Sequence, residues 1–142
     1  MDTMDIKTRE GLIGELRVEA DFLEQGYMTS KPATASCTYD LLVQYKGGDI
    51  KKVQIKSITP EENGIIVLPL RNRKNSSVAK NGRGQTHNYV ELGDFISVYN
   101  KRTKDIYHVP TSVLPLDKKT YRFKTNEHTG RSDAPSIEQY KL

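Results

Sequence analysis

The sequence predicts a single α/β domain in which a mixed β-sheet is flanked by helices. Three observations favour this class: a length of 142 residues, an amphipathic stretch near the N-terminus, and several short apolar runs of strand length after it. Only 35% of the residues are hydrophobic, but they gather in clusters instead of being evenly spread. This clustering indicates one folded core rather than a disordered chain.

The first predicted element is a helix over residues Asp5–Gln25. Gly26 stands where a glycine commonly ends a helix, because glycine adopts the left-handed conformation without steric cost. The apolar stripe of this helix, read from helical spacing, consists of Leu12, Ile13, Leu16, Ala20 and Leu23.

Short strands are predicted after the helix. Tyr39–Tyr45 and Ile50–Ile58 are rich in aliphatic residues, and the Lys46-Gly47-Gly48-Asp49 segment between them is typical of a β-hairpin. The other expected strands are Tyr27–Thr29, Ile65–Leu70 as the third strand of an antiparallel meander, and a second hairpin of Phe95–Tyr99 with Ile106–Val109. Pro110 assigns the end of that hairpin to a sheet edge.

The C-terminal part is less regular. We expect a helical turn at Thr111–Leu116 and a short strand at Tyr121–Lys124. Residues 1–124 then form the domain, and residues 125–142 are predicted to be a polar tail.

The length of the first hairpin loop decides which side chains share a sheet face. A loop of two or four residues sets Asp40 opposite Ile55, whereas a three-residue loop ending at Gly48 sets it opposite Gln54. Gln54 and Lys56 already share one face because side chains alternate along a strand. The three-residue loop would therefore gather a carboxylate, an amide and an ammonium at one place.

Such a group could hold a hard cation such as Mg²⁺, which prefers oxygen ligands. Asp40, the Gln54 side-chain oxygen and the Ile55 carbonyl are the candidate ligands. Lys56 could then orient or deprotonate a water, or stabilise a phosphate in transit. On spacing alone, an ordinary amphipathic strand with solvent-exposed lysines explains the pattern equally well.

The segment from Arg71 to Asn88 carries five cationic side chains and no acidic ones. Since the whole chain has a formal charge of +4, the remaining residues sum to −1. A nearly neutral body with one basic loop favours a polyanion such as DNA as the partner. The candidate DNA contacts, chosen for charge or for amide groups that read bases, are Arg71, Arg73, Lys74, Asn75, Lys80, Arg83 and Gln85.

Four segments together resemble the PD-(D/E)xK nuclease superfamily, whose fold is restriction endonuclease-like. They are Gly11-Leu12-Ile13-Gly14-Glu15, Gln25-Gly26-Tyr27, Tyr39-Asp40-Leu41-Leu42-Val43 and Val53-Gln54-Ile55-Lys56. Their order and spacing are most similar to the small intron-type homing endonucleases with a QxK motif. The resemblance covers Lys7–Ser57 best, with weaker support from Asp94–Pro110.

This resemblance implies roles for matching positions. Asp40 matches the metal-binding aspartate, Lys56 the catalytic lysine, and Glu15 the helix glutamate that orders metal or water. Glu19 is the rival of Glu15, and the GxxxE offset favours Glu15. Gln54 departs from the usual acid and removes one negative charge from the ion, so its role, as ligand or as hydrogen-bond donor, stays open.

The resemblance further implies a Mg²⁺-dependent endonuclease, for which Mn²⁺ can substitute, acting on double-stranded DNA at a specific site in the manner of homing or restriction enzymes. The alternatives are a Holliday junction resolvase and a catalytically inactive DNA-binding module of the same fold. One active centre per chain predicts a homodimer or homotetramer. With no stretch of about 20 apolar residues, we expect no membrane association. The expected location is intracellular, whether cytoplasmic, nucleoid-associated or organellar.

Overall fold

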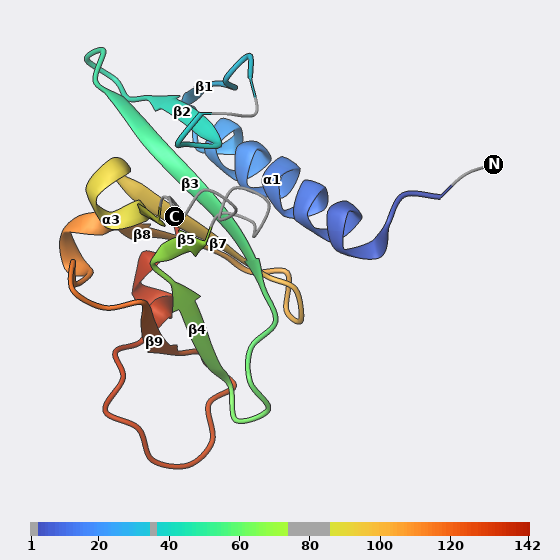
Figure 1. Ribbon diagram of the computed structural model, residues 1–142, viewed down its shortest axis with the longest axis vertical. Coiled ribbons are helices and arrows are strands. Elements are labelled where there is room, and N and C mark those ends of the chain that lie inside the picture. Colours follow the sequence, from blue (N-terminus) through green and yellow to red (C-terminus); the bar gives the residue numbers. More distant parts are fainter. Residues whose placement is uncertain (1–2, 35–36, 74–85) are drawn as a thin grey trace, which may run out of the picture.

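A computed structural model describes residues 3–34, 37–73 and 86–142 of the chain. The main sheet has five strands in the order β1-β2-β3-β7-β8, and two smaller two-stranded sheets are β4-β9 and β5-β6 (Figure 1). The helices are α1 (Ile6–Glu24) and α3 (Tyr89–Leu92), with two 3₁₀ turns, η1 (Thr111–Val113) and η2 (Ile137–Tyr140). The strands are β1 (Met28–Ser30), β2 (Leu41–Gln44), β3 (Ile50–Ile58), β4 (Ile65–Pro69), β5 (Arg71–Arg73), β6 (Thr86–Asn88), β7 (Phe95–Asn100), β8 (Ile106–Pro110) and β9 (Thr120–Lys124).

The first hairpin has the register predicted from a three-residue loop. Leu41 pairs with Val53 and Gln44 with Ile50, and the Asp40 N–H donates to the Val53 carbonyl at 2.9 Å. Gly48 has a φ of 95°, which an L side chain rarely adopts. The loop glycine therefore fixes the register that puts Asp40 on the face of Gln54.

The sheet is mixed because β3 pairs antiparallel with β2 and parallel with β7. The second hairpin, β7 with β8, forms as predicted, and Pro110 closes the edge strand β8. The predicted meander is wrong at Ile65–Leu70: β4 pairs with β9 instead of β3. The reason is that both edges of β3 are already occupied, one by β2 and the other by β7.

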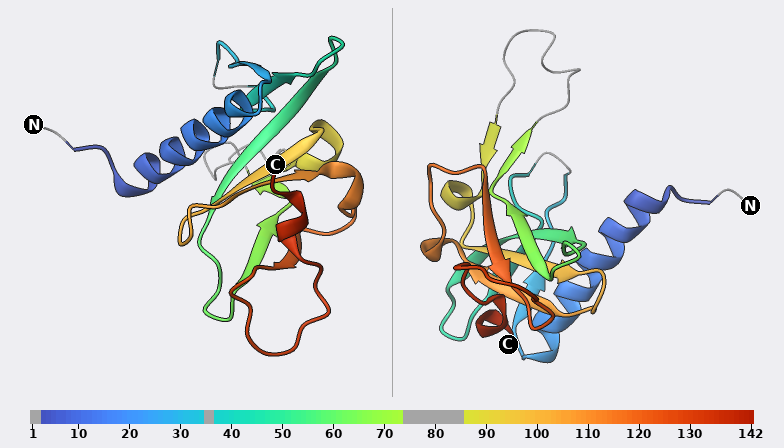
Figure 2. Two further views of the ribbon diagram at one scale, coloured as in Figure 1. Left: turned by 180° about the vertical axis from the view of Figure 1, so that it is seen from behind. Right: turned by 90° about the horizontal axis from the view of Figure 1, so that it is seen from below.

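Helix α1 lies across one face of the sheet, and its N-terminal end extends beyond the sheet (Figure 2). Asp5 caps this end by accepting a hydrogen bond from the Thr8 N–H, and Gly26 at φ 91° ends the helix as predicted. The predicted apolar stripe of α1 is wrong as the buried side of the helix. The residues that α1 buries are Gly14, Val18 and Phe22, whereas Leu12, Ile13, Leu16, Ala20 and Leu23 are exposed.

The burial of this other row has a physical reason. Gly14, Val18 and Phe22 recur every four residues, and this narrow row is sufficient to cover the sheet, where Phe22 and Val18 pack with Leu41, Val43, Val53, Ile55 and Tyr99. The larger aliphatic residues lie on the opposite side of the helix.

The second face of the sheet is covered by the β4-β9 ribbon, α3 and η2. Ile66, Leu68 and Phe123 from the ribbon pack against Ile96 and Val98 of β7. The predicted polar tail contributes to this core: Ile137 of η2 is fully buried, and Ser136 forms a bridge with Lys124. The C-terminal residues are therefore part of the domain. Over the described parts of the chain, there is no helix with the length and apolar character to cross a membrane.

A buried polar chain ties α1 to the sheet. His108 lies 2.7 Å from Ser97 through Nδ1 and 2.7 Å from the Asp21 carboxylate through Nε2. Burial lowers the pKa of His108 below its ordinary value of 6.5, although Asp21 opposes this shift. The neutral ring thus accepts from the Ser97 hydroxyl and donates to Asp21.

Because its folded-state pKa is depressed, His108 disfavours folding in acid. The free energy of unfolding should be highest above about pH 6.5, and it should fall as the pH drops through that value, where the unfolded chain binds the proton more readily. Chemical denaturation between pH 5 and pH 8, at about one-unit steps, measures this. His108→Gln should flatten the profile in this window, and an unchanged slope in that variant would assign the pH dependence to other groups.

Candidate active site

The site forms where β2 separates from β3. Asp40 immediately precedes β2, and its Oδ2 accepts hydrogen bonds from Gln54 Nε2 and from the Ile55 N–H, both at 2.8 Å. The carboxylate thus takes the place of a strand carbonyl opposite Ile55. Asp40 and Gln54 are in direct contact on one face of the sheet, as the hairpin register predicts.

Lys56 points from the same face of β3 toward α3. Its Nζ donates to the Tyr89 hydroxyl at 2.7 Å and lies 4.4 Å from the centre of the Tyr89 ring. Tyr89 is only 4% exposed and belongs to the core. Its contact with Lys56 was not predicted, because no local pattern links two residues separated by the basic loop.

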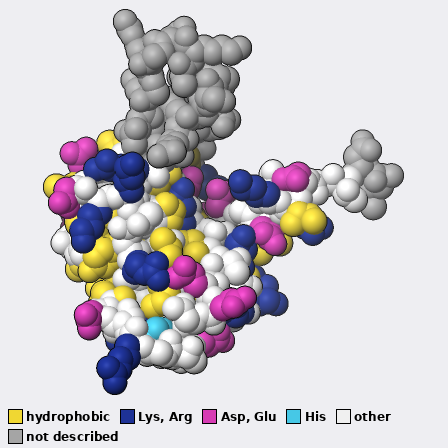
Figure 3. Space-filling model, turned by 60° about the horizontal axis from the view of Figure 1, so that its bottom comes forward, with side chains coloured by type: hydrophobic (Ala, Val, Ile, Leu, Met, Phe, Trp, Pro, Cys, Tyr) yellow, Lys and Arg dark blue, Asp and Glu magenta, His cyan; other side chains and the backbone are white. Residues whose placement is uncertain are grey.

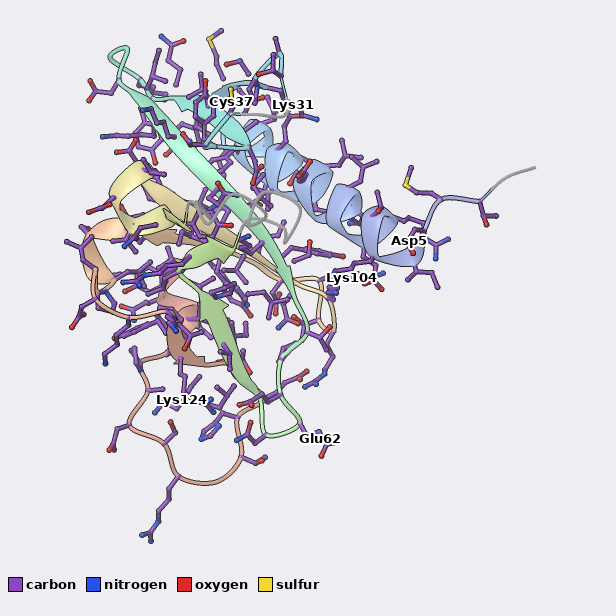
Figure 4. All side chains as sticks on the ribbon, viewed as in Figure 1. Asp5, Lys31, Cys37, Glu62, Lys104 and Lys124 are labelled. Atoms are coloured by element: carbon purple, nitrogen blue, oxygen red, sulfur yellow. The ribbon has the colours of Figure 1, made fainter. Side chains whose placement is uncertain are left out.

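The two helix glutamates have different surroundings. Glu19 accepts a hydrogen bond from Thr29 Oγ1 at 3.1 Å and pairs at 3.4 Å with Nζ of Lys31, which lies beside α1 (Figure 4). The charge of Asp40 instead acts on Glu15. Of the two candidates, Glu15 is therefore the one whose carboxylate the structure couples to Asp40.

The pKa values of the titratable groups at the site, those of Glu15, Asp40, Lys56 and Tyr89, are all shifted, with burial as the largest cause. Burial and the neighbouring Asp40 charge raise the pKa of Glu15, and burial raises the pKa of Asp40 against the opposing Ile55 hydrogen bond. Burial lowers the pKa of Lys56, and burial with the Asp40 charge raises the pKa of Tyr89 to about 12. Two partly buried carboxylates that repel each other, one of them interacting with a partly buried lysine, form an electrostatically strained group, as is common at functional sites.

Gly14 allows α1 to pack closely on β3. A Cβ at position 14 would lie 1.9 Å from Ser57 Oγ and 3.4 Å from the Tyr99 ring, so the helix contacts β3 through a residue with no side chain. The glycine of the GxxxE segment thus sets the distance between α1 and the strand that carries Lys56.

Gly14→Ala should therefore push α1 away from β3. We expect the free energy of unfolding to fall by about 1–3 kcal/mol, as for other overpacked cores. Activity should fall as well, since Glu15 moves with the helix. Gly11→Ala is the matched control, because nothing lies within 4 Å of its added Cβ. Denaturation and cleavage assays measure both effects. Adding Ser57→Gly to the Gly14→Ala variant should restore its stability and activity. Equal stability of the Gly14→Ala and Gly11→Ala variants would refute the close contact.

The donor set suits a hard cation with a small number of protein ligands. Both hydrogen bonds to Asp40 go to Oδ2, and Oδ1 makes none with the residues that the structure describes. A cation beside Oδ1 would offset the repulsion between Asp40 and Glu15. Within the described ranges, no three His, Cys, Asp or Glu side chains cluster for metal binding. At this site the described donors are the two carboxylates of Asp40 and Glu15 and the amide of Gln54.

The predicted DNA contacts fall largely outside this description. Lys74, Asn75, Lys80, Arg83 and Gln85 lie outside the described residues, and for Arg73 only the backbone in β5 is described. Arg71 donates through Nη2 to the Leu116 carbonyl at 3.2 Å. The DNA-binding role of the basic loop thus remains a prediction from its charge.

The fold agrees with a solved nuclease structure. A bacterial homing endonuclease, I-Ssp6803I, superposes with a TM-score of 0.69 over 96% of this chain and 89% of that chain, at 23% identity. A Holliday junction resolvase from Archaeoglobus fulgidus gives a TM-score of only 0.44 at 12% identity, covering 81% of this chain and 84% of that one. A search among curated proteins finds no match.

The chain therefore has the restriction endonuclease-like fold. It also matches the PD-(D/E)XK endonuclease family over residues 4–142. The chain belongs to this family, which confirms the resemblance predicted from its motifs.

Proposed function

We propose that the protein is a Mg²⁺-dependent endonuclease that hydrolyses phosphodiester bonds of double-stranded DNA at a specific site, as homing or restriction enzymes do. The observation that carries this proposal is the direct contact of Asp40 with Gln54, beside Lys56 and within the electrostatic reach of Glu15. These are the side chains of the PD-(D/E)XK motif, with Gln54 in place of the acid.

Asp40 and Glu15 would hold the cation, with the Ile55 carbonyl and the Gln54 amide oxygen as further ligands; Mn²⁺ can substitute for Mg²⁺. When bound, the ion supplies positive charge for the phosphate in transit and lowers the pKa of a water. Gln54 holds the Asp40 carboxylate in place through its Nε2. Lys56 orients the attacking water and stabilises charge on the phosphate through its ammonium group.

Cutting both strands needs two active centres, so the proposal includes a homodimer or homotetramer. The basic loop would supply phosphate contacts and base contacts through its arginines and amides.

One cleavage assay tests the proposal against its alternatives. The intact chain is incubated with Mg²⁺ and either a library of linear duplexes or a four-way junction. Cutting at a defined linear sequence is the expected result. Preference for junctions of any sequence would instead assign a resolvase, and binding without cutting would assign an inactive DNA-binding module.

Tyr89 offers a second test, because it positions Lys56. Tyr89→Phe removes the hydroxyl that accepts the 2.7 Å hydrogen bond but keeps the ring. We expect kcat to fall about tenfold, the order of magnitude for one hydrogen bond to a charged group, with KM unchanged. Tyr99→Phe on the opposite face is the control. Equal losses in the two variants, or a change confined to KM, would remove Tyr89 from this role.

A further inference from the structure

The exposed side of α1 has a second regular pattern. Its apolar side chains are 62% exposed at Ile6, 40% at Ile13, 49% at Leu16 and 52% at Leu23. Together with Arg9 and Ala20, they follow the 3-4 spacing of coiled-coil core positions. Hydrophobic and charged side chains are both exposed on the projecting end of the helix (Figure 3).

This stripe is not needed by the domain's own core. The opposite side of α1 packs on the sheet through Gly14, Val18 and Phe22, and it also directs Asp21 to His108. A helix that is apolar on two opposite sides usually has a second partner for the second side.

The order of residues along the stripe fits a second copy in antiparallel orientation. Pairing Ile13 with Leu16 of the second copy also sets Ile6 opposite Leu23 and Arg9 opposite Ala20. Every large apolar side chain then meets another, and the long arginine lies over the smallest residue of the stripe. This register is symmetric under a two-fold rotation axis near Gly14 and Glu15, as a symmetric dimer requires.

The flanking charges favour this orientation. In the antiparallel register, Glu10 lies beside Arg17 of the second copy, once on each side of the axis. The Glu10 carboxylate also pairs with Lys101 of its own chain at 2.9 Å and is 43% exposed. A parallel pair would instead place Arg9 on Arg9, Asp5 on Glu10, and Glu19 on Glu24, which are all like charges.

We propose that two copies of this chain associate through an antiparallel pairing of their α1 helices, with Ile6, Ile13, Leu16 and Leu23 as its apolar seam. A 19-residue helix is about 28 Å long and presents fewer than three heptads, so the pairing is expected in the micromolar range. The proposal is independent of cleavage, and its test does not measure nuclease activity.

The first test is sedimentation of the whole chain over a range of concentrations. Leu16→Lys should weaken self-association at least about 100-fold, because two leucines lose burial in each dimer. Leu116→Lys is the matched control: Leu116 is 55% exposed and lies outside α1. Circular dichroism checks that both variants fold. A monomer at all concentrations, or equal association of the Leu16 and Leu116 variants, would overturn the proposal.

Charge reversal tests the orientation. Arg17→Glu should weaken association, and Glu10→Arg combined with Arg17→Glu should restore it. Single cysteines in a Cys37→Ser background test the register, since Cys37 is exposed. Ile6→Cys should cross-link with Leu23→Cys when the two proteins are mixed, because the antiparallel register sets these positions opposite each other. Cross-linking of Leu23→Cys with itself would instead overturn the antiparallel pairing. Binding of a monomeric chain to anionic lipid vesicles would assign the stripe to a membrane surface instead.

Discussion

We expect Asp40→Ala and Lys56→Ala each to lower the rate of DNA cleavage by at least about a thousandfold. Asp40 is the residue to which Gln54, Ile55 and Glu15 are all coupled, and a cation held there contributes several kcal/mol to the transition state. DNA affinity should change little, because binding depends mainly on phosphate contacts away from the site.

Two matched controls lie on the same hairpin. Asp49→Ala removes an exposed carboxylate from the loop end, and Lys52→Ala removes an exposed lysine four residues before Lys56 on the same strand. Both should keep nearly full activity. Single-turnover cleavage with a parallel binding assay separates chemistry from affinity. If Asp49→Ala loses as much activity as Asp40→Ala, the loss reflects charge or folding and not the site. The same holds if Lys52→Ala loses as much activity as Lys56→Ala.

Gln54→Glu should separate the two roles left open for Gln54. The structure places Nε2, not an oxygen, against Asp40 at 2.8 Å, so a glutamate would bring two carboxylates together. We expect the maximal cleavage rate to fall and the Mg²⁺ concentration for half-maximal rate to decrease, because the added charge attracts the cation while the donor is lost.

Cleavage rates measured against Mg²⁺ concentration distinguish the two roles of Gln54. Gln54→Met is the control, because it lacks both the hydrogen-bond donor and the charge. A maximal rate equal to that of the original protein, at lower Mg²⁺, would mean that the amide serves only as a ligand. If Gln54→Glu and Gln54→Met give the same dependence of rate on Mg²⁺ concentration, the added negative charge does not explain the effect of Gln54→Glu.

The sequence was most informative where a single local feature determines geometry. Gly48 set the length of the hairpin loop, and loop length set the register, so the contact between Asp40 and Gln54 could be predicted. Gly26 likewise located the end of α1. In both cases the backbone conformation that favours glycine was sufficient to fix the structure nearby.

The incorrect predictions concern contacts between distant segments. Ile65–Leu70 is a strand, but its partner β9 lies more than fifty residues further along the chain, and strand propensity does not choose partners. The buried side of α1 was misassigned because two rows of residues satisfy helical spacing, and the row with more leucine and isoleucine is the exposed one. Tyr89 reaches Lys56 only through the packing of α3, for which the sequence contains no local signal.

The central claim is that Asp40, Gln54, Lys56 and Glu15 form one metal-dependent centre for phosphodiester cleavage. The most direct test compares linear duplex cleavage by one preparation of the intact chain in excess chelator and after restoring Mg²⁺. The account predicts no product in chelator and cleavage after Mg²⁺ is restored, with Asp40→Ala inactive in both conditions. Full cleavage in chelator, or by Asp40→Ala, would contradict it.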